Sequence, residues 1–276
     1  MLDKQTQTSL AIQFRQQHFG SRLLILPNIW DALGARLMEN LGYPSVATAS
    51  VATALTNGFL DGEHIPFGRL LEIVRTIASS VRLPLTVDME RGFAQDNIQQ
   101  LQENILLLIE HGAIGINIED SRPDHKSLFS VSEQCRKIEA VREISLRCGV
   151  PLVINARTDV FLTGSETNAL EEGIVRGQAY KAAGADCIYP VTISSYESIS
   201  RFVGEVGMPV NVLLMKSIPD LKRLKEIGVA RVSLGPNLLS HVLASMKEIA
   251  EGLMHENSSA FFNRELPSRE FRDSLV

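Results

Sequence analysis

The ten residues PLTVDMERGF, at positions 84–93, end an apolar run with three charged side chains, Asp88, Glu90 and Arg91. Side chains alternate along a strand, so Asp88 and Glu90 share one face while Met89 points to the other. Two carboxylates at about 4 Å repel by roughly 4 kcal/mol at an effective dielectric constant near 20. Such a pair needs a cation, protons or distance, and the segment therefore indicates a site of chemistry at the end of a strand.

Polar side chains also follow the other apolar runs of the chain, namely Asn28, Asp31, Ser50, Asp61, Glu119, Asp120, Arg157, Asp159, Asn211 and Ser233. This set is acidic, with one prominent arginine. Mg²⁺ suits oxygen-only ligands and takes one or two carboxylates directly while keeping several waters. We therefore expect Mg²⁺, or alternatively Mn²⁺, bound directly by Asp88, with metal-bound waters held by Asp61, Glu90 and Glu119.

Arg157 has a separate expected role, because a planar guanidinium can hold a substrate carboxylate through two hydrogen bonds. A metal ion chelated by a 2-oxo acid, with an arginine on its carboxylate, stabilises negative charge as it develops on the carbonyl oxygen. Together these residues predict cleavage of a bond next to a pyruvate unit.

The elements that must position these residues are short apolar runs alternating with helical patterns. Eight runs are typical of strands: 23–29, 45–50, 84–90, 115–120, 151–158, 185–191, 209–214 and 231–235. Between them, helical spacing is clear at 31–42, 68–81, 98–112 and 132–149, and glycines follow six helices at 42, 112, 149, 184, 207 and 228.

Strands that are apolar on both faces and separated by helices indicate a parallel sheet. Eight of them favour a closed (β/α)₈ TIM-type barrel, in which the C-terminal ends of the strands carry the active site. An open doubly wound sheet is the alternative, but the chain has neither a GxGxxG nor a Walker A pattern. We expect a single barrel domain over residues 1–276.

Composition narrows the class of ligand. The net charge is −5, without a basic patch, so we expect a small-molecule ligand and neither nucleic acid nor membrane as partner. The three cysteines, Cys135, Cys148 and Cys187, lack CxxC spacing, which argues against a disulfide framework or structural zinc. The polar N-terminus and the lack of a long apolar run predict a soluble cytoplasmic protein.

Six stretches in order resemble the isocitrate lyase and phosphoenolpyruvate mutase superfamily over roughly residues 20–250: PNIWDALGARLMENLGYPSVATAS, the Asp61 loop, VDMERGF, NIEDS, NARTDVFL, and PVNVLL with RVSLGP. The resemblance implies a Mg²⁺-dependent (β/α)₈ barrel that acts on small 2-oxo or 2-hydroxy acids through an enolpyruvate-like intermediate. Its metal positions correspond to Asp61, Asp88, Glu90 and Glu119.

The same resemblance implies further assignments. Arg157 would bind substrate, and the backbone at Ser50 and Val51 would hold its acid group. Members are usually tetramers that exchange a C-terminal helix, so the tail at about 254–276 is expected to pack on a neighbouring subunit.

Differences between this chain and the sequence motifs of the named enzymes narrow the choice of activity further. Isocitrate and methylisocitrate lyases carry a Lys-Lys-Cys-Gly-His or Lys-Arg-Cys-Gly-His loop that this chain lacks. Phosphoenolpyruvate mutase and phosphonopyruvate hydrolase have Asp-Ala-Asp-Thr-Gly-Tyr-Gly and Glu-Asp-Lys, where this chain has Val-Asp-Met-Glu-Arg-Gly-Phe and Glu-Asp-Ser. It resembles instead the broad phosphonomutase-like group, in which Asn is more typical at the position of Arg91. Arg91 is expected to pair with Glu90 or with a second acidic group of the substrate.

We expect a Mg²⁺-dependent lyase that cleaves or forms a C–C bond next to a 2-oxo acid, with oxaloacetate decarboxylation as a simple instance. The expected catalytic residues are Asp61, His125 and Arg157, where His125 lies in the loop SRPDHKSLF and is a candidate general acid or base. The expected substrate-binding residues are Ser50, Val51, Arg157, Asn211 and Ser233.

Four alternatives stay open. They are a P–C phosphonomutase or phosphonopyruvate hydrolase, a methylisocitrate lyase-like enzyme, a catalytically idle dicarboxylate-binding relative, and a phosphate-binding isomerase barrel. The last predicts Gly-rich loops after the seventh and eighth strands, and only SLGPN (233–237) resembles one.

Overall fold

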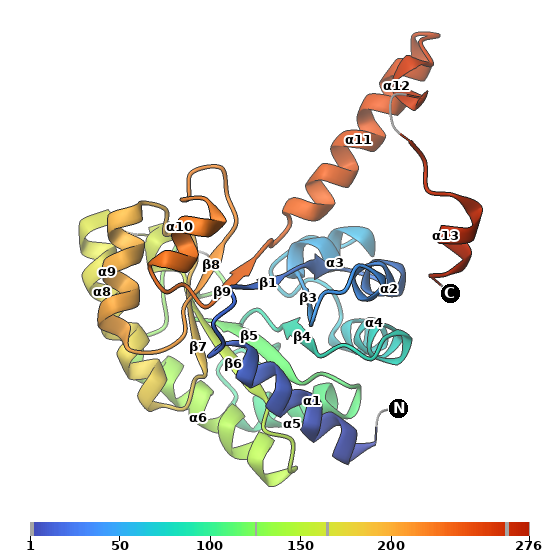
Figure 1. Ribbon diagram of the computed structural model, residues 1–276. Coiled ribbons are helices and arrows are strands. Elements are labelled where there is room, and N and C mark those ends of the chain that lie inside the picture. Colours follow the sequence, from blue (N-terminus) through green and yellow to red (C-terminus); the bar gives the residue numbers. More distant parts are fainter. Residues whose placement is uncertain (1–2, 125, 164–165, 263–264, 276) are drawn as a thin grey trace.

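The computed structural model describes residues 3–124, 126–163, 166–262 and 265–275. Parallel strands form its centre and helices surround them (Figure 1). The strands in the described part of the chain are β1 (Leu24–Leu26), β2 (Asn28–Ile29), β3 (Val46–Thr48), β4 (Leu85–Asp88), β5 (Gly115–Glu119), β6 (Val153–Thr158), β7 (Cys187–Pro190), β8 (Asn211–Leu213) and β9 (Arg231–Ser233).

Hydrogen bonding groups these strands as β2-β3-β4-β5-β6-β7 and β1-β9-β8. β1 and β2 are two halves of one predicted strand, interrupted at Pro27, which has no backbone N–H to donate. On the other side a parallel bridge joins Ile188 of β7 to Val210, just before β8, and the Ile188 N–H donates to the Pro209 carbonyl at 3.0 Å. The two groups therefore meet at both seams, in the order expected of an eight-stranded barrel.

The outer helices are α2 (Ala32–Asn40), α3 (Ser50–Thr56), α4 (Phe67–Ser80), α5 (Ile98–Glu110), α6 (Val131–Arg147), α7 (Val160–Thr163), α8 (Glu166–Ala182), α9 (Tyr196–Val206) and α10 (Leu221–Glu226). Four of them, α2, α4, α5 and α6, agree with the predicted periodic segments, and further helices lie between the other strands. All six glycines predicted to end helices have positive φ, which confirms that prediction. The observed strands are mostly shorter than predicted: Ser50 begins α3 and does not belong to β3, and β4 ends at Asp88. Glu90 therefore lies in the following turn, with φ of 46°, and the prediction that it shares a strand face with Asp88 is wrong.

Helix α1 (Lys4–Gln17) lies against the N-terminal ends of the strands (Figure 1). Its Phe14 is fully buried, beside Gly115 at the start of β5 and 6.0 Å from the Arg231 guanidinium at the start of β9. A Cβ on Gly115 would lie 3.0 Å from the Phe14 ring and 2.9 Å from Thr86 Oγ1. The missing side chain at position 115 thus leaves the room that Phe14 fills.

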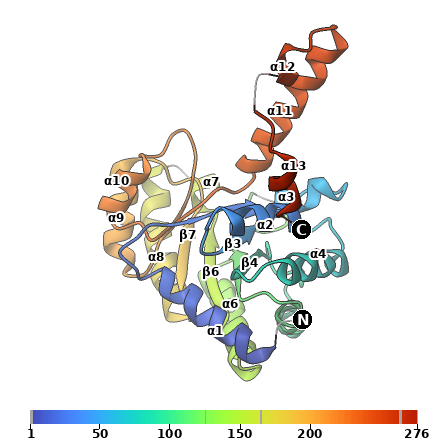
Figure 2. The ribbon, with the colours of Figure 1, turned by 45° about the vertical axis from the view of Figure 1, so that its right-hand side comes forward.

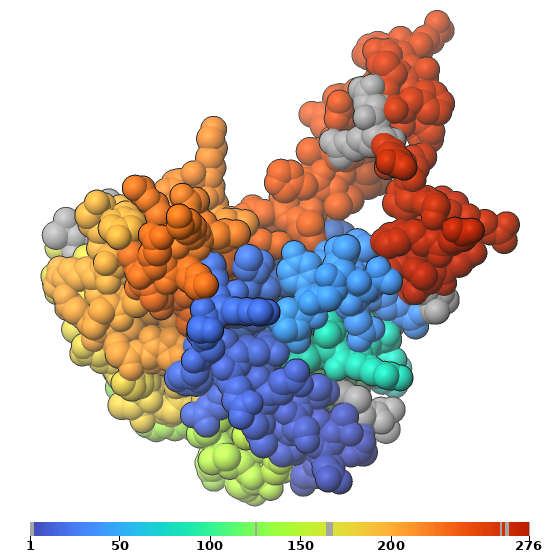
Figure 3. All heavy atoms as spheres, viewed as in Figure 1, coloured from blue at the N-terminus to red at the C-terminus, as the bar shows by residue number. Residues whose placement is uncertain are grey.

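The last helices extend beyond the barrel (Figures 1 and 2). They are α11 (Asn237–Met254), α12 (Ser259–Phe262) and α13 (Arg269–Asp273). After α13 the chain returns to α2, where Arg36 Nη1 donates to the Leu275 carbonyl at 3.0 Å. Figure 3 shows the projecting arm. Exposed apolar side chains on this arm are Val242, Leu243, Met246, Leu253, Met254, Phe261, Phe262 and Leu266.

Among the described residues, no helix combines the length and apolar character needed to cross a bilayer.

The packing around Gly115 generates a stability prediction. Replacing Gly115 with Ala forces Phe14 or Thr86 to move, so we expect the free energy of unfolding to fall by about 1–3 kcal/mol. Gly68→Ala is the matched control, because its Cβ would meet nothing within 4 Å and Ala favours a helix by about 1 kcal/mol. Urea unfolding measures both variants, and equal stability of Gly115→Ala and the wild type would contradict this packing.

Candidate active site

Asp88 ends β4 and lies at the C-terminal face of the barrel, as predicted. Its carboxylate accepts hydrogen bonds from the Ser50 N–H at 3.2 Å and from the Glu90 N–H at 3.4 Å, while its own N–H donates to Thr48 Oγ1 at 2.9 Å. Burial raises the pKa of Asp88; Arg157 opposes this rise, and Glu119 and Asp61 add to it. Backbone N–H groups therefore fix the Asp88 carboxylate, and other acidic side chains lie close enough to raise its pKa.

Glu90 follows in a turn with φ of 46°, a left-handed conformation that is uncommon for a residue other than glycine. Burial, and after it the nearby carboxylates in the order Asp88, Asp61, Glu119 and Glu63, raise the pKa of its carboxyl to about 9. Asp61 itself lies on an exposed turn, where its carbonyl accepts from His64 Nδ1 at 2.8 Å. We call Asp61, Asp88, Glu90 and Glu119 the carboxylate mouth.

Arg157 lies beside the carboxylate mouth because the β5–β6 register aligns it with Glu119. Its Nη1 contacts Glu119 Oε2 at 2.9 Å, and its Nε and Nη2 donate to the two oxygens of Asp159 at 2.6 and 2.9 Å. A guanidinium has five N–H groups, so these three contacts leave two for a ligand. The Arg157 side chain is 20% exposed, and it can therefore receive an acid from solvent.

Ser50 and Val51 form the first turn of α3, whose start has no side-chain cap among the described residues. The Ser50 N–H already donates to Asp88, which brings this helix end to the carboxylate mouth. The first N–H groups of a helix have no acceptor within it, so they are available to an acid group.

Other polar residues at the strand ends make hydrogen bonds within the protein. Asn211 and Ser233 are buried and hydrogen-bonded to each other at 3.0 Å. Asn28 connects strand ends, because its side chain donates to the Thr48 carbonyl and accepts from the N–H groups of Leu234 and Gly235.

Two acidic residues prove to be structural. Asp31 caps α2 by accepting from the Gly34 N–H. Asp120 is buried, accepts from the Asp159 N–H and pairs with Arg176. His125, the predicted general acid or base, lies outside the described residues.

Glu63 and Lys137 contribute to the site but were missed by sequence reasoning. Arg91 pairs with Glu63 at 3.3 Å and approaches Glu119 at 3.6 Å, so its partners are not the predicted Glu90. Lys137 of α6 is buried over the Phe129 ring at 4.4 Å. Burial lowers the pKa of Lys137 to about 8, and Glu63, Asp96 and Glu119 oppose that change. The only sequence signal for Glu63 was its place two residues after Asp61.

The donor set of the carboxylate mouth fits Mg²⁺. Its side chains offer oxygen alone, and they lie close enough for each to raise the pKa of Glu90 or Asp88. Within the ranges that the structure describes, no three His, Cys, Asp or Glu side chains converge as a ready-made ligand cluster. Mg²⁺ does not require such a cluster, because it takes one or two carboxylates directly and keeps its waters.

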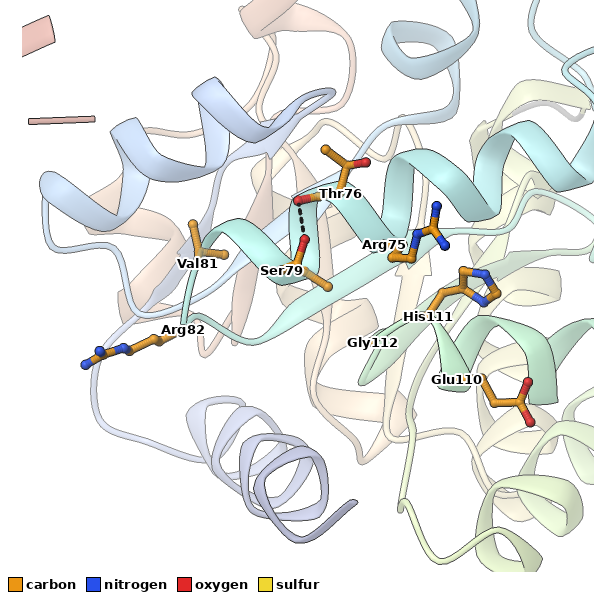
Figure 4. Close-up of a pocket in the computed structure, with 9 residues that line it drawn as sticks. Arg75, Thr76, Ser79, Val81, Arg82, Glu110, His111 and Gly112 are labelled. Carbon is orange, nitrogen blue, oxygen red and sulfur yellow. Dashed lines mark hydrogen bonds between the residues drawn. The ribbon is translucent and has the colours of Figure 1, made fainter. Parts of the chain in front are cut away.

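A cavity elsewhere is unrelated to this chemistry. About 480 Å³ in volume, it lies at the C-terminal ends of α4 and α5 and is lined by residues including Arg75, Ser79, Arg82 and His111 (Figure 4). Outer helices run opposite to the strands in a barrel of this kind, so this cavity lies at the face away from the carboxylate mouth.

Comparison with known proteins gives a consistent result. Residues 14–254 match the family model described as phosphoenolpyruvate phosphomutase. A 2-methylisocitrate lyase of Bacillus subtilis (strain 168) is 24% identical over 218 residues, which are 76% of this chain and 69% of the relative. Oxaloacetate decarboxylase 1 of Pseudomonas putida (strain W619) is 25% identical over 238 residues, which are 83% of this chain and 79% of the relative.

Solved structures agree in fold. A phosphonomutase-type protein from Burkholderia cenocepacia J2315 is 36% identical with a TM-score of 0.84, over 88% of this chain and 99% of that one. A phosphonopyruvate hydrolase in complex with oxalate and Mg²⁺ is 23% identical with a TM-score of 0.80, over 96% of this chain and 94% of that one. At that identity the second match supports the fold alone.

Glu90 generates a pH prediction for the metal-free protein. The pKa of Glu90 is about 9 in the folded protein, whereas the unfolded chain loses this proton near pH 4.5. The stability that Glu90 contributes is therefore full below pH 4.5 and falls as the pH rises toward 9. The loss from Glu90 reaches at most about 3 kcal/mol at pH 7. We expect Glu90→Gln to reduce this decline, measured by urea unfolding in EDTA at pH 5.5, 7 and 8.5.

The exposed Glu103→Gln serves as the control and should follow the wild-type pH dependence. A Glu90→Gln variant that lost stability in parallel with the wild type would show that Glu90 is already ionised in the folded protein.

Proposed function

This chain belongs to the phosphoenolpyruvate phosphomutase family, and we propose that it is a Mg²⁺-dependent lyase that cleaves or forms a C–C bond next to a 2-oxo acid. The observation that carries the proposal is the position of Arg157 beside the carboxylate mouth. Two N–H groups of Arg157 are left for a ligand. Relatives named oxaloacetate decarboxylase and 2-methylisocitrate lyase support the reaction class. The proposed substrate is a small 2-oxo or dicarboxylic acid.

In this proposal Asp88 holds Mg²⁺ directly, and Asp61, Glu90 and Glu119 hold metal-bound waters; Mn²⁺ is the alternative ion. When bound, the ion supplies a Lewis acid at the substrate's carbonyl oxygen. The Asp88 carboxylate is held by two backbone N–H groups, one on each oxygen. Ion binding would also displace the proton that Glu90 keeps in the metal-free protein.

Arg157 would hold the substrate carboxylate next to the oxo group. Asp159 and Glu119 fix the plane of its guanidinium, which lowers the entropy cost of forming two further hydrogen bonds. At the start of α3 the backbone N–H of Val51 would hold an acid group of the substrate, and Ser50, whose N–H donates to Asp88, would keep this helix end beside the metal site. Asn211 and Ser233 would form the substrate-facing floor beneath, where they are paired to each other.

For oxaloacetate, the reaction would break the bond between C3 and C4 and release carbon dioxide. The electron pair of that bond passes to C3 and the carbonyl oxygen, giving the enolate of pyruvate, and a proton added at C3 completes pyruvate. Water or His125 would supply this proton. Overall, oxaloacetate and one proton give pyruvate and carbon dioxide.

Cleavage of a P–C bond is a second candidate, favoured by the 36% identical phosphonomutase-type structure. The same residues would serve, with a phosphono group in place of the departing carboxylate. A methylisocitrate lyase-like reaction and an idle dicarboxylate-binding role use the same site, and a panel of acids distinguishes them.

The direct test compares Asp88→Asn with the exposed control Asp273→Asn. We expect oxalate with Mg²⁺ to raise the melting temperature of the wild type and the control but not of Asp88→Asn, because the direct ligand loses its charge. Oxaloacetate turnover, measured by pyruvate release, should fall at least about 100-fold in Asp88→Asn. Stabilisation by oxalate without turnover of any 2-oxo, phosphono or methylisocitrate-type acid would instead identify a binding protein. Unchanged turnover in Asp88→Asn would contradict the proposal.

We further propose a homotetramer in which the tail at about 254–276 packs on a neighbouring subunit. Apolar side chains on the projecting arm support this, since Met254 is 82% exposed and Phe262 74% exposed. The three cysteines carry no disulfide, which supports the cytoplasm as the compartment.

The assembly proposal predicts that charges on the arm disrupt the oligomer. We expect Met254→Glu combined with Phe262→Glu to lower the native mass from four chains toward one or two, because buried charges would oppose packing. Lys247→Glu, on a largely exposed side chain of the same helix, should leave the mass unchanged. Light scattering coupled to size exclusion measures all three proteins, and a monomeric wild type would contradict this assembly.

A further inference from the structure

Two loops beside the carboxylate mouth are held together by one ion pair. The loop at 57–66 carries Asp61, and the turn at 89–95 carries Glu90. Glu63 Oε1 accepts from the N–H groups of Arg91 at 3.1 Å and Phe93 at 2.7 Å. In return, Arg91 Nη2 donates to the Gly62 carbonyl at 2.9 Å and to Glu63 Oε2 at 3.3 Å. We call these four contacts the Glu63–Arg91 clasp.

The clasp joins segments with unusual backbone conformations. Glu63, Glu90 and Phe93 have φ of 64°, 46° and 53°, although none is glycine. Such conformations cost on the order of 1–3 kcal/mol each and persist only where surrounding contacts determine them. Two proposed metal-site residues, Asp61 and Glu90, stand within two positions of Glu63 or Arg91 along the chain, so the clasp constrains where their carboxylates lie.

Burial makes the loss of either partner costly and keeps Arg91 from solvent. The side chains of Arg91 and Glu63 are 5% and 15% exposed, compared with 20% for Arg157. Removing one partner of a buried ion pair leaves the other charge without compensation, which is strongly destabilising. Arg91 is therefore poorly placed to meet a substrate that arrives from solvent.

Arg91 also reaches the carboxylate mouth. Its Nη1 lies 3.6 Å from Glu119 Oε1, while Arg157 contacts the other oxygen of the same carboxylate at 2.9 Å. Within the described part of the chain, Arg91 Nε and Nη1 have no hydrogen-bond acceptor. The Arg91 side chain thus has unused donors on the side of Glu119, in addition to those that serve Glu63.

We infer that Arg91 is a positioning residue, which fixes Asp61 and Glu90 through the Glu63–Arg91 clasp and orients Glu119, and that it does not bind the substrate. The inference rests on the proposed function for its catalytic consequence, but the clasp itself can be tested without turnover.

The test is a double-mutant cycle with Glu63→Gln, Arg91→Met and the combined variant. Hydrogen exchange of the metal-free proteins reports the loop at 57–66, and calorimetry with Mg²⁺ alone reports affinity. We expect each single variant to speed exchange in this loop and to weaken Mg²⁺ binding about tenfold or more. The combined variant should lose less than the sum of the two single variants, because both changes remove the shared side-chain ion pair although each side chain also has contacts of its own.

The kinetic readout separates positioning from substrate binding. We expect kcat for the best 2-oxo acid to fall in both single variants, while the preference for dicarboxylic over monocarboxylic acids stays within about twofold of the wild type. Arg91→Lys keeps the charge without the planar fork, so it should restore part of the loss. Removing the exposed Arg69–Glu72 pair by Glu72→Gln is the matched control and should change neither readout.

Each outcome decides a different point. Additive effects of the two changes, or unchanged exchange at 57–66, would overturn the clasp. A shift of more than tenfold in acid preference in Arg91→Met but not in Glu63→Gln would show that Arg91 contacts substrate, which also overturns the inference. If Arg91→Met fails to fold, Arg91→Lys and Glu63→Asp complete the same cycle. If the variants show coupled effects on exchange in the loop at 57–66 but the wild type turns over no acid, the clasp is supported and the proposed function is refuted.

Discussion

Repulsion among buried carboxylates is the constraint on which the structure of this site depends. Asp88, Glu90 and Glu119 lie together where water is largely excluded, and each would be costly to ionise there alone. Two arginines offset part of that cost, since Glu119 lies between Arg157 and Arg91. The protonated state of Glu90 offsets another part. What remains is an excess of negative charge at one end of the barrel, which a divalent cation would neutralise.

The barrel makes this arrangement possible at little cost to its core. Parallel register places Asp88 beside Asn117, and Glu119 beside Arg157, so charged side chains from neighbouring strands meet at one end. At the other end Phe14 fills the space over Gly115 with apolar contacts. Stability therefore comes mainly from one face and the middle of the barrel, while the C-terminal face is left for chemistry, as is general for this fold.

Much of the fold was predictable, because buried parallel strands and amphipathic helices leave strong periodic patterns. Asp88, Glu90, Glu119 and Arg157 were predictable for a related reason, since strand ends in a parallel barrel converge. Contacts between loops could not be predicted. Glu63 and Arg91 are 28 positions apart in the chain, and the backbone turns that bring them together follow no local sequence pattern. The same applies to Asn28, a polar residue at a strand end whose side chain connects Thr48 to Leu234 and Gly235. The hydrogen bond between Asn211 and Ser233 was likewise not predictable, because strand alternation does not specify which side chains pair.

The central claim is that the carboxylate mouth binds a divalent cation through Asp88. Anomalous diffraction from crystals soaked with Mn²⁺ and oxalate tests it most directly, because Mn²⁺ favours the same oxygen ligands as Mg²⁺ and scatters anomalously. We expect one strong peak within bonding distance of an Asp88 carboxylate oxygen, with oxalate between that peak and Arg157. A peak elsewhere in the molecule, or an Asp88 carboxylate without a metal ion under saturating Mn²⁺, would contradict it.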